Sequence, residues 1–562
     1  MMYGDFCGKG TTSVGRTKKK HTVYTCICTG CGKRLKGDAL CFDLNPVIKK
    51  KLTEYATGKG EKSVVDKILN EYGNDHYGPA LLSERELWEQ TAGLTQVSAG
   101  RWQGTLQISL REWQNPRQKL SDEEIQLWSN VMALASKKCG GDSLQIPVDY
   151  HKISDGATRI NMVRAADEEI DTRYCPICGE EMSFWSGQFP ELVLTVVGGP
   201  RASKSTALTA CASFFMEHGK RCGITWDGKE DLDGTWKDFK KRCLDPYNEN
   251  RRVEPTQSGD RDAIPRFSAR ITVAGVEGMP RRDLILTVVD LPGEWDANSE
   301  NGGIRLDSKI YKEYQEFYSN VDCVWYCTDQ AELEQMDIEA ATEDMKKKRA
   351  VLGYDPGRKL IRTSERVEKL NRYAGLFQKD IPVVFLLGKS DCYQNEVDDQ
   401  DLYQKNYYQR NYEQKCDWIE IISGSSPVIY GRDYHKKALF LRKFLISRNA
   451  ELVRGFEEAF SARTYIAASC YGHAVKQNPD GQKPEPEPKE EPAKEPYQSE
   501  LPLLWTLAVK GYLMVKDESE EHYAHKDRLT WERLCLYGPR LHTYGSTVHK
   551  GRSFRERFFG KG

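Results

Sequence analysis

Four cysteines carry the first chemical signal, in the stretches "CTGCG" and "CPICG". Each stretch places two thiols on a tight turn that ends in glycine, and two such knuckles supply the four thiolates of a tetrahedral, structural Zn²⁺ site. A long segment separates the knuckles, which a metal clip tolerates because the cost of loop closure grows slowly with length. Two unrelated redox-active pairs are the alternative interpretation, and Cys26 and Cys41 are alternative ligands. The predicted zinc ligands are Cys28, Cys31, Cys175 and Cys178.

A phosphate-binding loop is the second signal, in "LVLTVVGGPRASKSTALTA" from residue 192 to 210. The Walker A pattern G-x-x-x-x-G-K-[ST] holds phosphate with backbone N–H groups and a helix N-terminus, and adds a lysine and a Mg²⁺-binding hydroxyl. Ser203 replaces the second glycine and Pro200 lacks an N–H, so a similar turn without a ligand is the alternative. The residues expected at a nucleotide are Gly198, Gly199, Ser203, Lys204, Ser205 and Thr206.

Two later stretches end predicted strands with residues that suit a nucleotide. In "LTVVDLPGEW", Asp290 can hold Mg²⁺ together with Ser205, and the Gly293 N–H can sense a terminal phosphate. A common Asp-Pro-Gly turn is the alternative there. In "FLLGKSD", Asp391 can accept hydrogen bonds from guanine while the Lys389 stem packs on the base. The usual pattern at that place is [NT]-K-x-D, and glycine stands at its first position here.

A weaker fourth stretch is "YIAASCYG", where the backbone around Ser469 can contact the guanine oxygen. A plain buried strand end explains this stretch equally well. Four signals in this order, each at the end of a predicted strand, are far more specific than any one of them.

Residues 188–520 therefore resemble the P-loop GTPase superfamily. The stretch "DLPGEW" is similar to the D-x-P-G-E-W signature of bacterial YcjX-like and double-GTPase proteins, and "LPLLWTL" resembles the helix that those proteins carry after the last strand. The resemblance implies a guanine-nucleotide switch or hydrolase that uses GTP/GDP and Mg²⁺, in a bacterial stress or conflict system. Ser203 and Gly388 depart from the pattern, and these departures concern nucleotide affinity rather than the fold.

Hydrolysis needs an oriented water and neutralisation of charge on the transferred phosphoryl group. Beside Lys204, the candidates are Glu294 and Arg201. Glu294 stands where many GTPases place a glutamine, and its carboxylate would repel the γ-phosphate, so we expect slow turnover. Arg201 is a candidate cis arginine, and a solvated loop arginine is the alternative. Thr256 is the candidate switch threonine, against an ordinary surface threonine.

These residues require an α/β scaffold to position them. From residue 188 onward, nearly continuous apolar strands alternate with amphipathic helices, which predicts a mostly parallel sheet with helices on both faces. The expected order is a flexible N-terminus (1–24), a split zinc ribbon (25–41 and 171–187) around an α+β insertion (42–170), a GTPase-like domain (188–476), a Pro/Glu/Lys linker (477–500), a helix that completes the domain (501–520) and a basic, aromatic tail (521–562).

The bulk composition narrows the class of partner. The formal net charge of −1 over 562 residues gives no global field for nucleic acid or membranes. No apolar run reaches the roughly 20 residues of a membrane span, and the N-terminus lacks a signal peptide's apolar segment.

Most of the cysteines stand singly in the sequence, which favours reduced thiols and a cytoplasmic protein. The expected partners are a nucleotide and an unidentified protein, such as an activator or a second GTPase domain. Nucleic-acid contact through the tail is not favoured over a solvated tail.

Two other functional classes remain open. The first is a pseudo-GTPase scaffold, in which the fold and the ribbon serve protein contacts. The second is an ATP-dependent P-loop enzyme, against which the guanine-type stretch from Gly388 to Asp391 argues.

Overall fold

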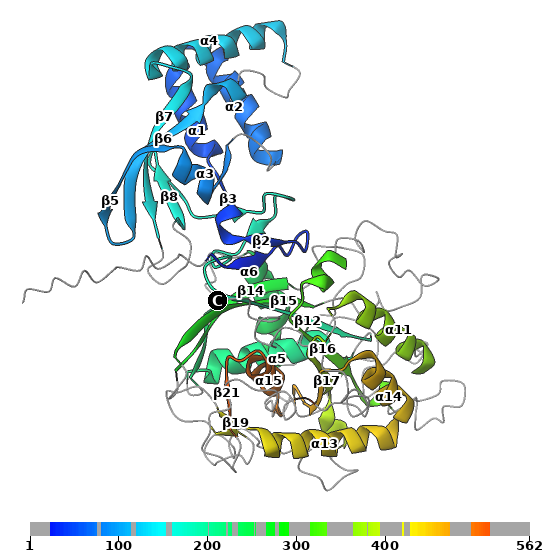
Figure 1. Cartoon of the computed structure of the whole chain (residues 1–562). Coiled ribbons are helices and arrows are strands. Elements are labelled where there is room, and N and C mark those ends of the chain that lie inside the picture. The colour runs from blue at the N-terminus through cyan, green and yellow to red at the C-terminus, as the bar shows by residue number, and fades with distance from the viewer. Residues whose placement is uncertain are drawn as a thin grey trace, which may run out of the picture.

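The computed structural model contains an α/β body, a small cysteine-rich region and an insertion on the far side of that region (Figure 1). None of the helices described combines the length and apolar character that a bilayer crossing requires. The structure describes residues 23–75, 80–113, 120–152, 160–199, 202–220, 223–227, 234–251, 253, 266–275, 280–290, 315–333, 363–378, 380–393, 419–420, 428–471, 496–516 and 535.

A seven-stranded sheet forms the centre of the α/β body. Five strands run parallel, in the order β15-β12-β16-β17-β20, and β14 pairs antiparallel with β15 while β13 pairs antiparallel with β14. The mostly parallel α/β architecture predicted from the apolar runs is confirmed, and β13 is a strand that the sequence analysis did not predict. The bounds are β12 (Glu191–Gly198), β13 (Ile224–Asp227), β14 (Arg266–Val273), β15 (Arg282–Asp290), β16 (Cys323–Thr328), β17 (Val383–Leu387) and β20 (Arg463–Ala467).

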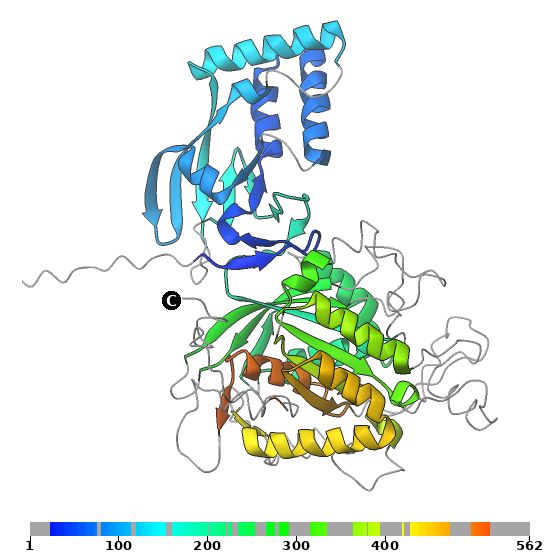
Figure 2. The same ribbon diagram turned by 45° about the vertical axis from the view of Figure 1, so that its right-hand side comes forward.

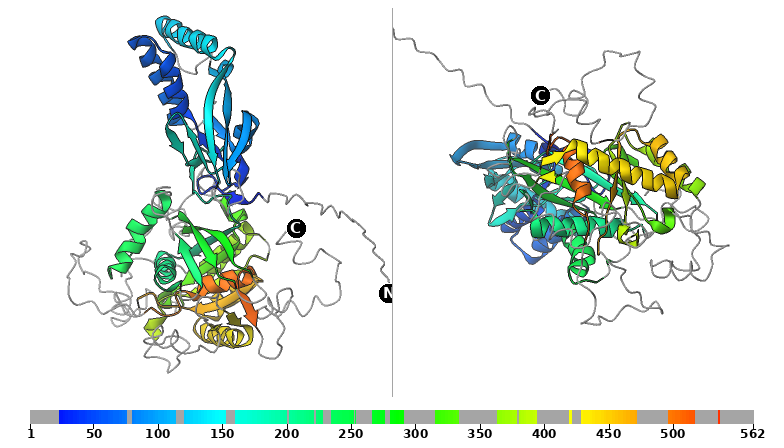
Figure 3. Two further views of the ribbon diagram at one scale, coloured as in Figure 1. Left: turned by 90° about the vertical axis from the view of Figure 1, so that its left-hand side faces the viewer. Right: turned by 90° about the horizontal axis from the view of Figure 1, so that it is seen from below.

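Helices cover both faces of this sheet, as neighbouring residues of β16 show. Trp325 donates a hydrogen bond from Nε1 to Thr506 Oγ1 at 3.1 Å, on α15 (Leu501–Val509). The next residue, Tyr326, points to the opposite face and packs 5.8 Å from the ring of Phe456 on α14 (Ala450–Ala459). The remaining long helices of the body are α5 (Lys204–His218), α11 (Thr363–Leu376) and α13 (Gly431–Arg448), and the views of Figure 3 place α13 at the outer side of the body.

Shorter elements complete the α/β body. A small sheet forms from β18 (Ile419–Glu420), β19 (Val428–Tyr430) and β21 (Met514–Lys516). Further short segments among the described residues include α6 (Gly234–Phe239), a π-helical stretch (Lys240–Leu244), α7 (Asp245–Asn248), α9 (Gln330–Leu333) and a 3₁₀ turn (Ser390–Tyr393).

The C-terminal boundaries differ from the prediction. The helix expected over 501–520 ends at Val509. The N–H of Tyr512 bonds the Leu507 carbonyl at 2.8 Å, and the N–H of Gly511 bonds the Ala508 carbonyl at 2.9 Å. This pair of hydrogen bonds is a C-terminal capping pattern, which ends the helix. Residues 514–516 then form β21. The predicted linker, residues 477–500, also extends too far toward the C-terminus. Tyr497 exchanges two backbone hydrogen bonds with Ser469 and is fully buried, so it belongs to the α/β body.

The insertion is an antiparallel sheet with helices packed on one face, and it has a hydrophobic core of its own. Ser121 and Glu124 form a reciprocal capping box at the start of α4, which defines where that helix begins. Figure 2 shows α4 crossing the far ends of α1 and α2. The elements are α1 (Asn45–Tyr55), α2 (Lys59–Asp75), α3 (Glu84–Glu89), α4 (Asp122–Cys139), β5 (Thr91–Ser98), β6 (Arg101–Ser109), β7 (Ser143–His151), β8 (Met162–Ala165) and β9 (Glu168–Ile170).

The cysteine ribbon joins the insertion to the α/β body. We use this name for β1 (Thr25–Ile27), β2 (Arg34–Lys36), β10 (Arg173–Tyr174) and β11 (Glu181–Met182), with their turns. β10 also pairs with β3 (Cys41–Asp43), which pairs with β4 (Leu81–Ser83).

The ribbon packs against the amino ends of the body's strands. Arg34 donates from Nη2 to the carbonyl of Asn320 at 2.9 Å, just before β16. Glu191, the first residue of β12, accepts hydrogen bonds from the Ile27 N–H of the ribbon and from the Thr287 hydroxyl of β15. The ribbon therefore lies at the edge of the sheet opposite to the carboxyl ends of the parallel strands.

Candidate functional site

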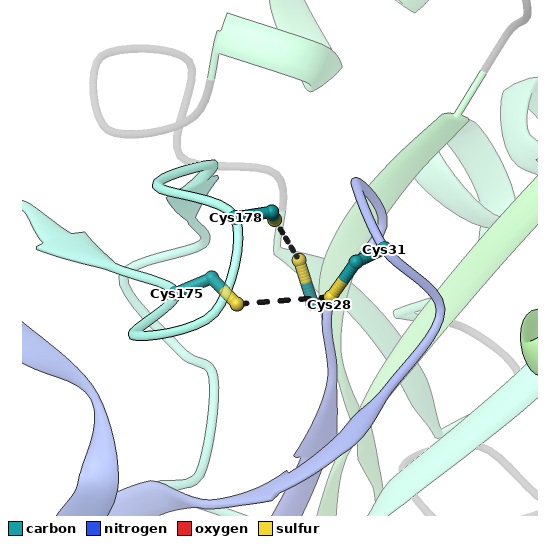
Figure 4. Close-up of side chains that lie close together, drawn as sticks. All are labelled: Cys28, Cys31, Cys175 and Cys178. Carbon is teal, nitrogen blue, oxygen red and sulfur yellow. Dashed lines mark hydrogen bonds between the residues drawn. The ribbon is translucent and has the colours of Figure 1, made fainter. Parts of the chain in front are cut away.

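The four predicted cysteine ligands lie together in the ribbon. Their sulfur atoms all lie within 4.8 Å of one another, with 3.5 Å between Cys28 and Cys178 and 3.8 Å between Cys31 and Cys175 (Figure 4). A tetrahedral Zn²⁺ with Zn–S bonds of about 2.3 Å places its sulfur atoms about 3.8 Å apart. The cluster therefore has the ligand type and the spacing of a four-thiolate zinc site.

The two knuckles have the same backbone hydrogen bonds. The N–H of Cys28 bonds the Lys33 carbonyl at 3.0 Å, and the N–H of Cys175 bonds the Glu180 carbonyl at 2.8 Å. In each turn a glycine with positive φ, at 72° and 73°, donates back to the first cysteine's carbonyl. Glycine is required there because other residues rarely adopt this conformation. Each local sequence thus builds half of the cluster by itself.

The four thiols also perturb one another. Hydrogen bonds from Cys178 and Cys28 lower the pKa of Cys175 to about 7, whereas hydrogen bonds to Cys175 and Cys178 raise the pKa of Cys28. A divalent cation would remove this competition by holding all four sulfurs as thiolates.

The alternative ligands lie outside this cluster. Burial raises the pKa of Cys41 to about 12 and raises that of Cys26 further, and Cys41 donates weakly to the Ala39 carbonyl at 3.6 Å. Neither residue belongs to the four-cysteine group found among the described residues.

The predicted nucleotide residues gather at the carboxyl ends of the parallel strands. β12 ends at Gly198, β15 at Asp290, β17 at Leu387 and β20 at Ala467, and the paired registers keep these ends at one edge. β12 is also the point where the order reverses, because the chain continues to β14 and β15 on one side and then to β16 on the other. Open α/β sheets bind ligands at such a switch point, beyond the carboxyl ends of the strands.

The phosphate loop connects β12 to the start of α5. Lys204 is buried, and its Nζ donates to the carbonyls of Gly198 at 3.1 Å and Gly199 at 2.9 Å. Ser205 donates from its hydroxyl to Asp290 Oδ2, which joins the start of α5 to the end of β15. Thr206 follows on the first turn of α5, half-buried.

The base loop follows β17, and side chains from two other strand ends support it. Ser469 donates from Oγ to Asp391 Oδ1 at 2.5 Å, so the carboxylate is held by the loop after β20. Lys389 forms an ion pair with Asp329 Oδ2 at 3.1 Å. The Gly388 N–H bonds the Thr328 carbonyl at 2.8 Å and the Ser390 N–H bonds the Ala468 carbonyl at 3.2 Å. The loops after β16, β17 and β20 therefore form one hydrogen-bonded unit.

Several expected residues lie outside the part of the chain that the structure describes. They are Pro200, Arg201, Thr256, Gly293 and Glu294. The roles assigned to them remain predictions.

Asp329 is a residue that the sequence analysis missed. It follows β16 directly, and its side chain is only 1% exposed. The available signal was the stretch "CVWYCTD", in which a carboxylate directly follows a buried strand at the same edge as the other loops. Such a carboxylate requires a partner when buried, and Lys389 supplies it.

Tyr247 on α7 was also missed. Its hydroxyl donates to the Cys470 carbonyl at 2.7 Å, and Tyr471 donates in turn to the Arg251 carbonyl at 3.1 Å. These bonds tie the loop after β20 to the segment between α5 and β14.

Comparison with known proteins gives little further information. No family model matches the sequence, and no curated protein matches it. A solved structure of the Ski7 GTPase-like domain from S. cerevisiae, bound to GTP, matches at 13% identity with a TM-score of 0.15. The match covers 40% of this chain and 41% of that chain, so it spans less than half of either. A likeness with a TM-score this low shows neither the fold nor a ligand of this chain.

Proposed function

We propose that this chain is a P-loop GTPase that binds GTP or GDP with Mg²⁺ at the carboxyl edge of the seven-stranded sheet and hydrolyses GTP slowly. The supporting observation is that the carboxyl ends of β12, β15, β17 and β20 meet at one switch point, where Lys204, Asp290 and Asp391 have the residue types expected at a nucleotide. Within the superfamily, the stretch "DLPGEW" favours the bacterial YcjX-like and double-GTPase group, and with it a role as a switch in a stress or conflict system.

The phosphate end of the site fits an anion. Lys204 and the N-terminus of the 15-residue helix α5 offer positive charge at the loop that follows β12. The Lys204 ammonium now bonds two loop carbonyls, which are weaker partners than a phosphate. The neighbouring Ser205 hydroxyl and Asp290 carboxylate are hard oxygen donors in contact with each other, and this is the donor set that suits Mg²⁺. When bound, Mg²⁺ would neutralise charge on the terminal phosphates.

The base end of the site fits guanine. A carboxylate can accept two hydrogen bonds from neighbouring N–H groups, and Ser469 fixes the orientation of Asp391 for that purpose. Adenine lacks this pair of donors, and the ATP-dependent alternative is therefore disfavoured.

The cysteine ribbon has a structural part in this proposal. Its core consists of six buried residues, with Cys31 and Cys178 packed against them, which is too small to be stable without further support. Zn²⁺ bound by the four thiolates would hold the two knuckles together and fix the insertion to the α/β body.

Binding of labelled GTP and ATP by the zinc-loaded protein with Mg²⁺ tests the proposal, with Lys204→Ala as the comparison. We expect GTP to bind at least about tenfold more tightly than ATP and the variant to lose at least about 100-fold in affinity. If a folded protein binds neither nucleotide at millimolar concentration, the proposal is wrong and the scaffold interpretation replaces it.

A further inference from the structure

Two departures from the nucleotide-binding patterns, far apart in the sequence, lie against each other in the fold. Ser203 stands at the usual second glycine of the phosphate loop, and Gly388 stands at the usual asparagine or threonine of the base loop. A Cβ atom placed on Gly388 would lie 3.4 Å from the Cβ of Ser203 and 3.5 Å from the carbonyls of Ala202 and Thr328. The side chain at 203 therefore lies next to the position that a side chain at 388 would take.

The backbone conformations do not explain either residue. Ser203 has φ 62° and ψ 24°, in the left-handed region that favours glycine. Gly388 is not among the glycines of positive φ, so its φ does not require glycine. The position whose backbone favours glycine thus carries serine, and the position whose φ does not require glycine carries glycine. The proximity of the two loops offers an explanation for both residues.

We propose that Ser203 and Gly388 form a reciprocal pair that positions the phosphate loop against the base loop. A Cβ at 388 would already be in van der Waals contact with the Ser203 side chain, so a side chain larger than alanine at 388 would compete with Ser203 for space. This inference rests on the proposed nucleotide function for its consequence, because both loops would contact one ligand. Ser203 is then a positioning residue rather than a sign of a degraded site.

Other contacts support the base loop without a side chain at 388. The Gly388 and Ser390 N–H groups bond carbonyls of the neighbouring strand ends, and Lys389 pairs with Asp329. The loop thus keeps its place through its backbone and the ion pair. In the phosphate loop, the Cβ of Ser203 is the side-chain atom nearest to the position that a Cβ at 388 would take.

A double-variant cycle on thermal stability tests the pair without any nucleotide, using S203G, G388N and S203G/G388N. In the background that keeps Ser203, we expect G388N to lower Tm by about 2–6 °C, because the asparagine side chain competes with Ser203 for space. In the S203G background, we expect the same substitution to lower Tm by less than half as much. G388A is the matched control, since its Cβ would make only ordinary contacts, and we expect a shift below about 2 °C. Additive shifts in the cycle would overturn the pairing.

Binding of labelled GTP with Mg²⁺ to the same variants tests the functional consequence. We expect each single variant to bind about 3- to 10-fold more weakly than wild type and the double variant to recover to within about twofold. A degraded loop predicts the opposite, namely that S203G alone binds more tightly than wild type, and that result would contradict our inference. If wild type binds no GTP, the proposed function fails, and the stability cycle still decides whether the two residues are coupled.

Discussion

The two edges of the central sheet show two different ways in which a sequence specifies a site. At the amino edge, each cysteine knuckle is complete within a few residues, and the cluster forms when two equal turns meet. At the carboxyl edge, the loops take their places only through the register of β12, β15, β16, β17 and β20, and through contacts such as those of Asp329 and Ser469. A site that is determined locally can be predicted from the sequence. The supporting residues of a site that is assembled from many strands are identified only from the fold.

The largest effect is expected from loss of the metal centre. Cys175→Ser leaves three thiolates around an ion and two knuckles without a sufficient core, so we expect loss of about one zinc per chain and a fall in Tm of more than about 10 °C. Elemental analysis and thermal unfolding measure both quantities. Cys139→Ser is the matched control, because Cys139 lies at the end of α4, away from the cluster. Equal behaviour of the two variants would rule out a metal role for the cluster.

A pH effect is expected next, where the ribbon meets β12. Burial raises the pKa of Glu191 to about 7, against a hydrogen bond from Thr287 that lowers it. Its Oε2 atom is buried although the residue as a whole is partly exposed. Between about pH 4.5 and pH 7, the folded protein keeps a proton on the Glu191 carboxyl that the unfolded chain has lost. The contribution to stability is therefore full below about pH 4.5 and is lost as the pH rises through about 7, by up to roughly 3 kcal/mol.

Glu191→Gln should remove this part of the pH dependence, because the amide stays neutral. Denaturant unfolding at pH 5 and pH 8 measures the difference, with Glu89→Gln as a control at a carboxylate on α3, away from the ribbon contact. An unchanged slope of stability against pH in Glu191→Gln would show that this carboxyl does not keep its proton in the folded ribbon contact.

A smaller effect is expected at the base loop. Asp329→Asn keeps the shape but removes the anion that pairs with Lys389, which is itself 28% exposed and can turn to water. We expect a loss of about 1 kcal/mol in stability and about 3- to 10-fold in GTP affinity. Asp380→Asn is the control, since it changes an exposed aspartate before β17. Equal GTP affinity in both variants would remove Asp329 from the site.

The smallest effect is expected at the partly exposed contact of the ribbon with the body. Arg34→Ala removes the hydrogen bond to the Asn320 carbonyl, at a cost of about 0.5–1 kcal/mol. Protease sensitivity of the ribbon and thermal unfolding measure it, with the exposed neighbour Lys33→Ala as control. A cost above about 2 kcal/mol would mean that the two edges are more strongly coupled than their contacts indicate.

The sequence predicts much of this molecule where the signal is local. Apolar runs predict the strands that carry Gly198 and Asp290, and the C-x-x-C spacing predicts the four cysteines that the fold brings together. It does not predict β13, whose four residues are too few for a clear pattern, or the end of α15 at Val509, which a capping turn decides. The ion pair of Asp329 and the proximity of Ser203 to the Cβ position of residue 388 depend on strand pairing, which no single stretch reveals.

The most direct test of the central claim is the nucleotide preference of Asp391→Asn, measured by competition against labelled GTP with Mg²⁺. An amide at this position presents an N–H₂ group where guanine also donates, and it suits the carbonyl of xanthine instead. Our account predicts that the ratio of GTP to XTP affinity falls by roughly 100-fold or more, while binding of the triphosphate through Lys204 and Ser205 is kept. An unchanged ratio, in a variant that still binds GTP, would contradict a guanine site at the carboxyl edge of this sheet.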